Sequence, residues 1–283
     1  TSGGCGGWHA GVVKPGLGQV RRYRMADLLI ELVCEEIPAR MQNMAAQHFA
    51  TAVKTALVDL GVWTDAASIN GLCGPRHLAI YARGIALSQP DRVIEKRGPR
   101  VDSPETAIDG FVASAGVPRE ALSEEDTPKG RFFFARKHLT GANTKSLLCG
   151  VVTSVLTDFP WPKSQRWGRG SFRWVRPLHR INVLFDGDAL AGSHDLGGGD
   201  ALAFGTKSCG HYFESPGDIS LEGVGSIDEF KQRLSLAHVI IDQSDRCAAI
   251  IDEAKSLAKS VGCTVNEAQL GHYIQDIAGL VEC

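Results

Sequence analysis

The chain opens, after a glycine-rich stretch, with an apolar run followed by a helical repeat. Residues 27–34 (DLLIELVC) form an apolar run of strand length, and the acidic turn EEIP follows it. Proline suits the first turn of a helix, and acidic residues just before it favour the positive end of the helix dipole. Apolar residues then recur at helical spacing until Gly61 ends the helix: Met41, Ala45, Phe49, Ala52, Ala56 and Leu60. This pattern predicts a strand, an acidic turn and a long amphipathic helix.

The middle of the chain carries shorter patterns. They predict three elements: a half-buried strand at residues 78–82, a short helix at 104–115 and an aromatic strand at 131–136. Residues 90–104 are strongly charged and contain a Gly-Pro-Arg turn, so we interpret them as irregular. Asn143 is a suitable cap for a helix that runs to about Asp158, where the following prolines break it.

The second half of the chain changes from short strands to helices. Residues 181–185 predict a strand, and the dense glycines of residues 187–210 predict loops and short strands. From Ile227 onward the apolar spacing is helical, with a strand at 239–241 between helices. The predicted fold class is therefore α+β: a mixed α/β N-terminal region with short sheets, followed by a mainly helical C-terminal part.

These patterns predict three regions along the chain. Residues 1–24 carry basic residues, no acid and no apolar run, so we expect a disordered upstream extension with the natural start at Met25. Residues 25–215 form the α+β region and residues 216–283 the helical region, with the boundary near residues 210–225. The sequence does not begin with methionine and stops directly after a helical pattern. We therefore expect a piece of a longer protein, truncated at its C-terminal end.

Composition narrows the class of protein. Apolar residues make up 43% and charged residues 22%, which is ordinary for a soluble globular protein. The net charge of −2 predicts no general attraction to polyanions, so any nucleic-acid surface must be a local patch. No apolar run approaches the roughly 18 residues of a membrane span. The eight cysteines form no CxxC pair, which disfavours a zinc site and favours a reducing compartment; we expect a cytoplasmic protein.

One stretch, residues 160–180 (PWPKSQRWGRGSFRWVRPLHR), has a distinct chemistry; we call it the basic aromatic segment. Its arginines can neutralise phosphates, and its aromatic rings can stack on unpaired bases. Arginine and tryptophan are also enriched at protein interfaces, and Trp174 with Val175 can simply anchor the segment in a core. RNA contact, a subunit interface and a plain structural role therefore remain open. The candidate residues for RNA binding or an interface are Lys163, Arg166, Trp167, Arg169, Arg173, Trp174, Arg176 and His179.

The sequence offers no catalytic or metal-binding motif. It contains neither a P-loop motif nor HExxH. A hydrolase using His179 or His211 with a nearby acid is an alternative that no spacing supports. Cys34 precedes Glu35 and Glu36, and neighbouring acids raise the pKa of a thiol, which is wrong for a nucleophile. We predict no catalytic residue, no metal site and no cofactor in this chain.

Five segments, in this order, resemble one family. They are LLIELVCEEIPAR (28–40), GPRHLAI (74–80), QPDRVIEKRGPRV (89–101), SQRWGRGSFRWVRPLHRI (164–181) and GHYF (210–213). Together they resemble the β subunit of the bacterial α2β2 glycyl-tRNA synthetase, from about Met25 to the end. The sequence departs from the family pattern at several positions: Tyr212 stands where an arginine is usual, and Arg180 where an aromatic residue is usual.

This resemblance implies a function shared between subunits. The family's complex joins glycine to tRNA(Gly) with ATP and magnesium, which the α subunit uses in its class II active site. The β subunit serves mainly tRNA recognition and assembly. The implied partners are the α subunit, a second β subunit and tRNA(Gly), with no membrane. The family's β chain continues into an HD-like domain and an anticodon-binding region, so this chain alone is expected to be inactive. The alternative is a purely structural scaffold subunit with the basic aromatic segment at an interface.

Overall fold

The computed structural model describes residues 24–283, which form two compact units. The smaller contains Gln89–Ala142, and the larger contains residues 24–88 together with Asn143–Cys283. The fold class is α+β, as predicted. The predicted division into residues 25–215 and 216–283 does not coincide with these units, and the inserted unit has no glycine- or proline-rich linker that marks its ends. The predicted disordered extension lies outside the described residues, apart from Arg24.

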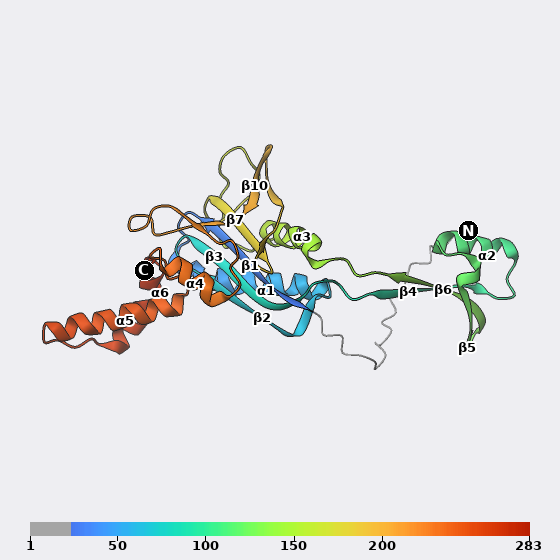
Figure 1. Ribbon diagram of the computed structural model, residues 1–283, viewed down its shortest axis with the longest axis horizontal. Helices are drawn as coiled ribbons and strands as arrows, with labels where there is room; N and C mark the ends of the chain where they lie inside the picture. The colour runs from blue at the N-terminus through green and yellow to red at the C-terminus, as the bar shows by residue number, and fades with distance from the viewer. Residues whose placement is uncertain (1–23) are drawn as a thin grey trace. The chain divides into compact units, whose positions relative to one another are not determined.

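The larger unit is built on a sheet with the strand order β2-β3-β1-β7-β10-β9, in which β8 also pairs with β7 (Figure 1). Its three central strands run antiparallel: β1 (Met25–Cys34), β3 (His77–Ala86) and β7 (Leu178–Phe185). The outer strands are β2 (Trp63–Cys73), β8 (Asp188–Ala189), β9 (Ser193–Gly197) and β10 (Asp200–Gly205). The predicted strands at 78–82 and 181–185 are confirmed. The sequence does not predict strand β2, because it is a largely exposed edge strand without regular apolar alternation.

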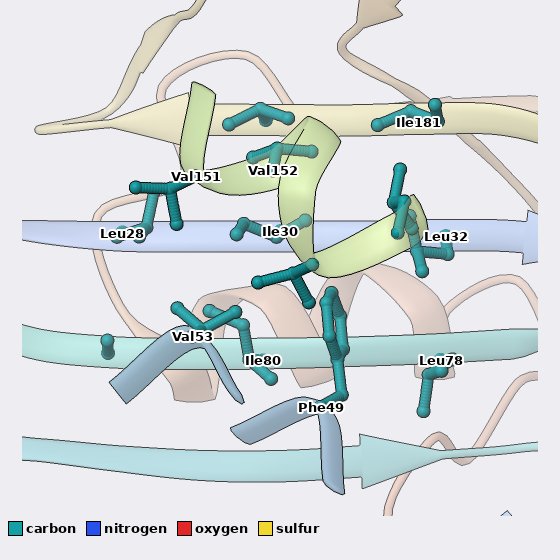
Figure 2. Close-up of a cluster of buried hydrophobic side chains, with 14 of the residues drawn as sticks. Leu28, Ile30, Leu32, Phe49, Val53, Leu78, Ile80, Val151, Val152 and Ile181 are labelled. Atoms are coloured by element: carbon teal, nitrogen blue, oxygen red, sulfur yellow. The ribbon is translucent and has the colours of Figure 1, made fainter. Parts of the chain in front are cut away.

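Two helices cover one face of this sheet. They are α1 (Ala39–Asp59) and α3 (Thr144–Thr157), and Figure 2 shows their side chains interleaved with those of the central strands. Leu28, Ile30 and Leu32 of β1 point to this face, while Leu29 packs on the other, so β1 is buried on both sides. This double burial explains its continuous apolar run. The long helix and the Asn143 cap are confirmed, since the Asn143 side chain accepts a hydrogen bond from the Lys145 amide at 2.9 Å.

The chain after β10 covers the opposite face and ends in helices (Figure 1). Its elements are β11 (Lys207–Cys209), β12 (Asp218–Ser220), α4 (Ile227–Ser235), α5 (Gln243–Ser260) and α6 (Glu267–Ala278). The predicted strand at 239–241 is wrong: Val239 and Ile241 fill the core from a connecting segment, whose Ile240 amide bonds to Glu282. In the described chain, no helix has the length and apolarity to cross a membrane.

The inserted unit is a three-stranded sheet with one helix on it. Its strands β4 (Arg92–Arg100), β6 (Gly130–Leu139) and β5 (Leu122–Thr127) lie in that order. Helix α2 (Glu105–Ala115) packs on the sheet, and a short 3-10 turn, η1 (Arg119–Ala121), follows. The predicted helix and aromatic strand are confirmed. The prediction that residues 90–104 are irregular is wrong, because cross-strand ion pairs such as Arg136–Glu95 at 2.7 Å accommodate the charges of β4.

Candidate RNA or subunit interface

The basic aromatic segment leaves α3 and enters β7 through a path fixed by backbone contacts. Gln165 and Trp174 exchange two backbone hydrogen bonds, of 2.8 and 3.1 Å. The Phe172 amide bonds to the Leu196 carbonyl at 3.0 Å. A Cβ on Gly170 would collide with that same carbonyl, so the close approach requires glycine there. The segment therefore has a defined shape without regular secondary structure.

The aromatic residues of this segment face inward. Trp174 is fully buried, with 0% of its surface exposed. Its ring centroid lies 5.0 Å from those of Phe159 and Trp161 and 5.8 Å from that of Phe172. Trp167 packs edge-on against Phe172 at 5.7 Å and is half-buried. Trp174 cannot stack on a base or meet a partner, so its place in the candidate set is corrected to that of an anchor.

The basic residues of the segment face outward. Lys163, Arg166, Arg169, Arg173 and Arg176 are all exposed. Arg169 forms one long ion pair with Asp200 at 3.5 Å, and Arg173 donates to the Ser164 hydroxyl and carbonyl at 3.1 and 2.8 Å. Among the described residues, no carboxylate lies within ion-pair distance of the other three or of Arg173. The structure thus presents five of the eight candidate residues as exposed cations on one segment of the chain.

Four of the five sequence segments that suggested the family converge at one end of the large sheet. The Cys34 and Ile37 amides bond to the carbonyls of Arg76 and Pro75, at 2.9 and 2.6 Å. The Glu35 amide bonds to Pro177 at 3.0 Å, and the Glu35 carboxylate meets the exposed His179 imidazole at 2.7 Å. Arg76 donates to the Gly210 carbonyl at 2.7 Å, which adds the fourth segment. His179 is therefore a link between segments.

A buried polar network lies beneath this end, and sequence reasoning missed it. The Glu31 carboxylate accepts hydrogen bonds from Ser208 at 2.6 Å and Asn182 at 2.7 Å, and lies 3.1 Å from His77 Nδ1. These residues are at most 1% exposed and come from β1, β11, β7 and β3. The one charged residue inside the apolar run LLIELVC was the signal that could have revealed it.

The imidazole of this network is held protonated. Burial alone lowers the pKa of His77, but its hydrogen bonds to Cys209 and Glu31 and the charge of Glu31 outweigh burial and raise the pKa to about 9. The buried pair is therefore an ion pair that ties three strands of the sheet to β11. Its atoms are fully inside the protein, which makes it a structural feature.

The other candidates for catalysis are Cys34 and His211, and both have structural roles. Burial, with a smaller contribution from the neighbouring Glu35 charge, raises the pKa of the Cys34 thiol to about 12, so the thiol stays protonated, as predicted. His211 Nδ1 accepts hydrogen bonds from the Phe213 and Glu214 amides at 3.3 and 3.1 Å. Neither geometry resembles a nucleophile activated by a base. His179 does have the nearby acid that the hydrolase alternative requires, since Glu35 lies at 2.7 Å, but among the described residues no hydroxyl or thiol is hydrogen-bonded to this imidazole.

Comparison with known proteins decides the family. A family model described as glycyl-tRNA synthetase beta subunit matches residues 28–283. The chain belongs to this family. Curated glycine–tRNA ligase beta subunits agree: the Rhodospirillum centenum protein is 37% identical over 278 residues, covering 91% of this chain and 38% of the relative. Those of Paracoccus denitrificans and Dinoroseobacter shibae are 38% and 39% identical, again over 91% of this chain, and 36% and 35% of their own length.

Membership of the glycyl-tRNA synthetase beta subunit family confirms the resemblance seen in the five segments. The chain spans little more than a third of the length of these relatives. The structure adds that four of the segments form one assembled end of the sheet, which their spacing in the sequence does not show.

Proposed function

We propose that the chain acts as part of the β subunit of a cytoplasmic glycine–tRNA ligase. In this role it contributes to tRNA(Gly) binding and to assembly with an α subunit and a second β subunit in a heterotetramer. The α subunit supplies the ATP- and magnesium-dependent aminoacylation chemistry, and this chain supplies no catalytic residue. The family membership and the relatives named as glycine–tRNA ligase beta subunits support this assignment.

The observation that carries the RNA part of the proposal is the row of exposed cations on the basic aromatic segment. Arginine binds phosphate through two parallel N–H donors, and Arg166, Arg173 and Arg176 have no carboxylate to compete with it in the described structure. The buried Trp174 holds the backbone that carries them, so the backbone loses little conformational entropy on binding. A local patch of this kind is compatible with a net charge of −2 for the whole chain.

The test is binding of the chain to tRNA(Gly) across a salt series. Contact with several phosphates predicts an affinity that falls steeply with salt, since each neutralised phosphate contributes about 0.7–0.9 to the slope of log K against log salt. A flat salt dependence or no binding, combined with a stable complex with the α subunit, would favour the scaffold alternative. The inward packing of Trp167 and Trp174 removes base stacking by these rings from the RNA proposal, and it leaves the exposed cations as the groups that either function would use.

A further inference from the structure

Strand β11 ends in a cysteine whose sulfur is in contact with two cationic side chains. Cys209 Sγ lies 3.7 Å from His77 Nε2 and 3.7 Å from the Arg76 guanidinium. Because His77 is held protonated, its Nε2 carries a hydrogen and donates to the sulfur, as Arg76 does. Cationic donors beside a thiol favour the thiolate, which is the form that reacts with electrophiles.

A buried carboxylate orients the imidazole that faces this sulfur. Glu31 lies 3.1 Å from His77 Nδ1, and Glu31 is itself held by Ser208 and Asn182 at 2.6 and 2.7 Å. Thiol, imidazole and carboxylate therefore contact one another in series, which is the arrangement of an activated nucleophile with an oriented partner. Glu31 and His77 are 0% exposed, so solvent screens the charge of the imidazolium very little.

The Cys209 side chain differs from its two charged neighbours in the network because it can be reached from outside. Cys209 is half-buried and lines an open cavity of about 420 Å³, together with Arg76, Arg180 and Gly217. A reagent of a few heavy atoms fits a cavity of this size, since one water molecule occupies about 30 Å³. The buried imidazolium thus acts on a thiol at the wall of a cavity.

The other cysteines lack this combination of access and charge. Burial raises the pKa of Cys34 to about 12 and that of Cys73 to about 11, which keeps both thiols protonated. Cys263 is exposed, but its sulfur lies 3.9 Å from the Val261 carbonyl and meets no cationic side chain of the described chain. Among the described residues, Cys209 is therefore the thiol whose surroundings favour reaction.

We propose that Cys209 is a modification site, at which a hydroperoxide oxidises the thiolate to a sulfenic acid. The sulfur attacks one peroxide oxygen, the S–O bond forms and the O–O bond breaks. With hydrogen peroxide, hydroxide leaves and is protonated to water. The sulfur loses two electrons and the peroxide gains them. A thiol reductant reverses the modification. His77 and Arg76 are positioning residues that favour the attacking thiolate, and the inference does not depend on tRNA or on a partner subunit.

The experiment treats the chain with hydrogen peroxide and dimedone, which traps sulfenic acids, and follows each cysteine by mass spectrometry of its peptides. At pH 6.5 we expect Cys209 to be labelled at least about tenfold faster than Cys263, although Cys263 is the more exposed. An ordinary thiol, with a pKa of about 8.5, loses roughly 75-fold in thiolate between pH 8 and pH 6. Labelling of Cys209 should fall by less than about tenfold over the same range.

Three variants separate the contacts of the sulfur from the general charge of the cavity. His77→Gln and Arg76→Gln each remove one cation from the sulfur, and each should slow labelling of Cys209 at pH 6.5 by at least about fivefold. The matched control is Arg180→Gln, because Arg180 lines the same cavity but pairs with Asp218 at 2.8 Å. Its labelling rate should stay within about twofold of the wild type. Circular dichroism confirms that each variant is folded.

A wild-type chain in which Cys209 is labelled no faster than Cys263 at pH 6.5 overturns the proposal. This comparison needs no variant, so it decides the matter even if His77→Gln does not fold. Folded His77→Gln and Arg76→Gln proteins that keep the wild-type rate also overturn it. So does an equal loss of rate in Arg180→Gln, because the overall charge of the cavity, and not the contacts of the sulfur, would then set the reactivity.

Discussion

At the scale of single residues, the structure separates side chains that the sequence places next to one another. Trp174 and Arg173 are neighbours in the chain, yet one is fully buried and the other is exposed. Alternation of this kind comes from the extended backbone around the Gln165–Trp174 bridge, because successive side chains of an extended chain point to opposite sides. The buried anchor Trp174 and the exposed cation Arg173 therefore depend on the same extended stretch of backbone.

Truncation of the anchor should destabilise the larger unit. Trp174→Ala removes a ring in contact with three other aromatic residues, and we expect it to lower the free energy of unfolding by about 3–5 kcal/mol. Trp167→Ala, at a half-buried position, should cost only about 1–2 kcal/mol. Urea unfolding followed by circular dichroism measures both values. Equal losses for the two variants would show that Trp174 is not the anchor.

The buried ion pair predicts a pH dependence of stability. The pKa of His77 is raised from 6.5 to about 9 in the folded protein, so protonated His77 stabilises the fold. This contribution is fully present below pH 6.5 and is lost as the pH rises through about 9. We expect the free energy of unfolding to fall by about 3 kcal/mol across that window. His77→Gln should flatten the profile, which urea unfolding at a series of pH values measures. Parallel profiles for the wild type and His77→Gln would refute this.

At the scale of elements, the sequence predicts best where one physical signal dominates. The apolar run of β1, the repeat of α1 and the Asn143 cap of α3 were all predicted correctly. Strands β2 and β4 were not, because edge strands and charged strands owe their structure to partners that are distant in the chain.

The candidate site was predictable only in part, for the same reason. An arginine-rich stretch is visible in the sequence, but its exposure depends on how Trp174 packs. The network around Glu31 and the surroundings of Cys209 depend on contacts between residues up to 177 positions apart, such as Ser208 and Glu31. Pattern reasoning along the chain does not reach contacts at that separation.

The inserted unit should be removable. Its two ends leave the larger unit next to one another, where Ser88 and Asn143 form a bridge and the Thr144 amide bonds to Leu87 at 2.9 Å. We expect replacement of Gln89–Ala142 by a short glycine–serine linker to leave the larger unit folded, because that unit has its own core. Thermal unfolding by circular dichroism tests this. A chain that aggregates or lacks a cooperative transition would show that the larger unit depends on the insert.

At the scale of the whole molecule, the proposed function requires a local RNA surface on a nearly neutral chain. Overall charge is close to neutral, so selectivity for RNA must come from a local arrangement of cations. Under the proposed function, the exposed arginines of the basic aromatic segment provide this arrangement.

The most direct test of this account is the salt dependence of tRNA(Gly) binding by the variant Arg166→Ala/Arg173→Ala/Arg176→Ala. Its charge-matched control removes three exposed cations elsewhere: Arg92→Ala/Lys137→Ala/Lys259→Ala. The account predicts that the first variant binds about tenfold more weakly or worse, with a slope of log K against log salt reduced by about 2–3, while the control changes neither value. Equal behaviour of the two variants would contradict the account, because it would show that the basic aromatic segment is not the RNA surface.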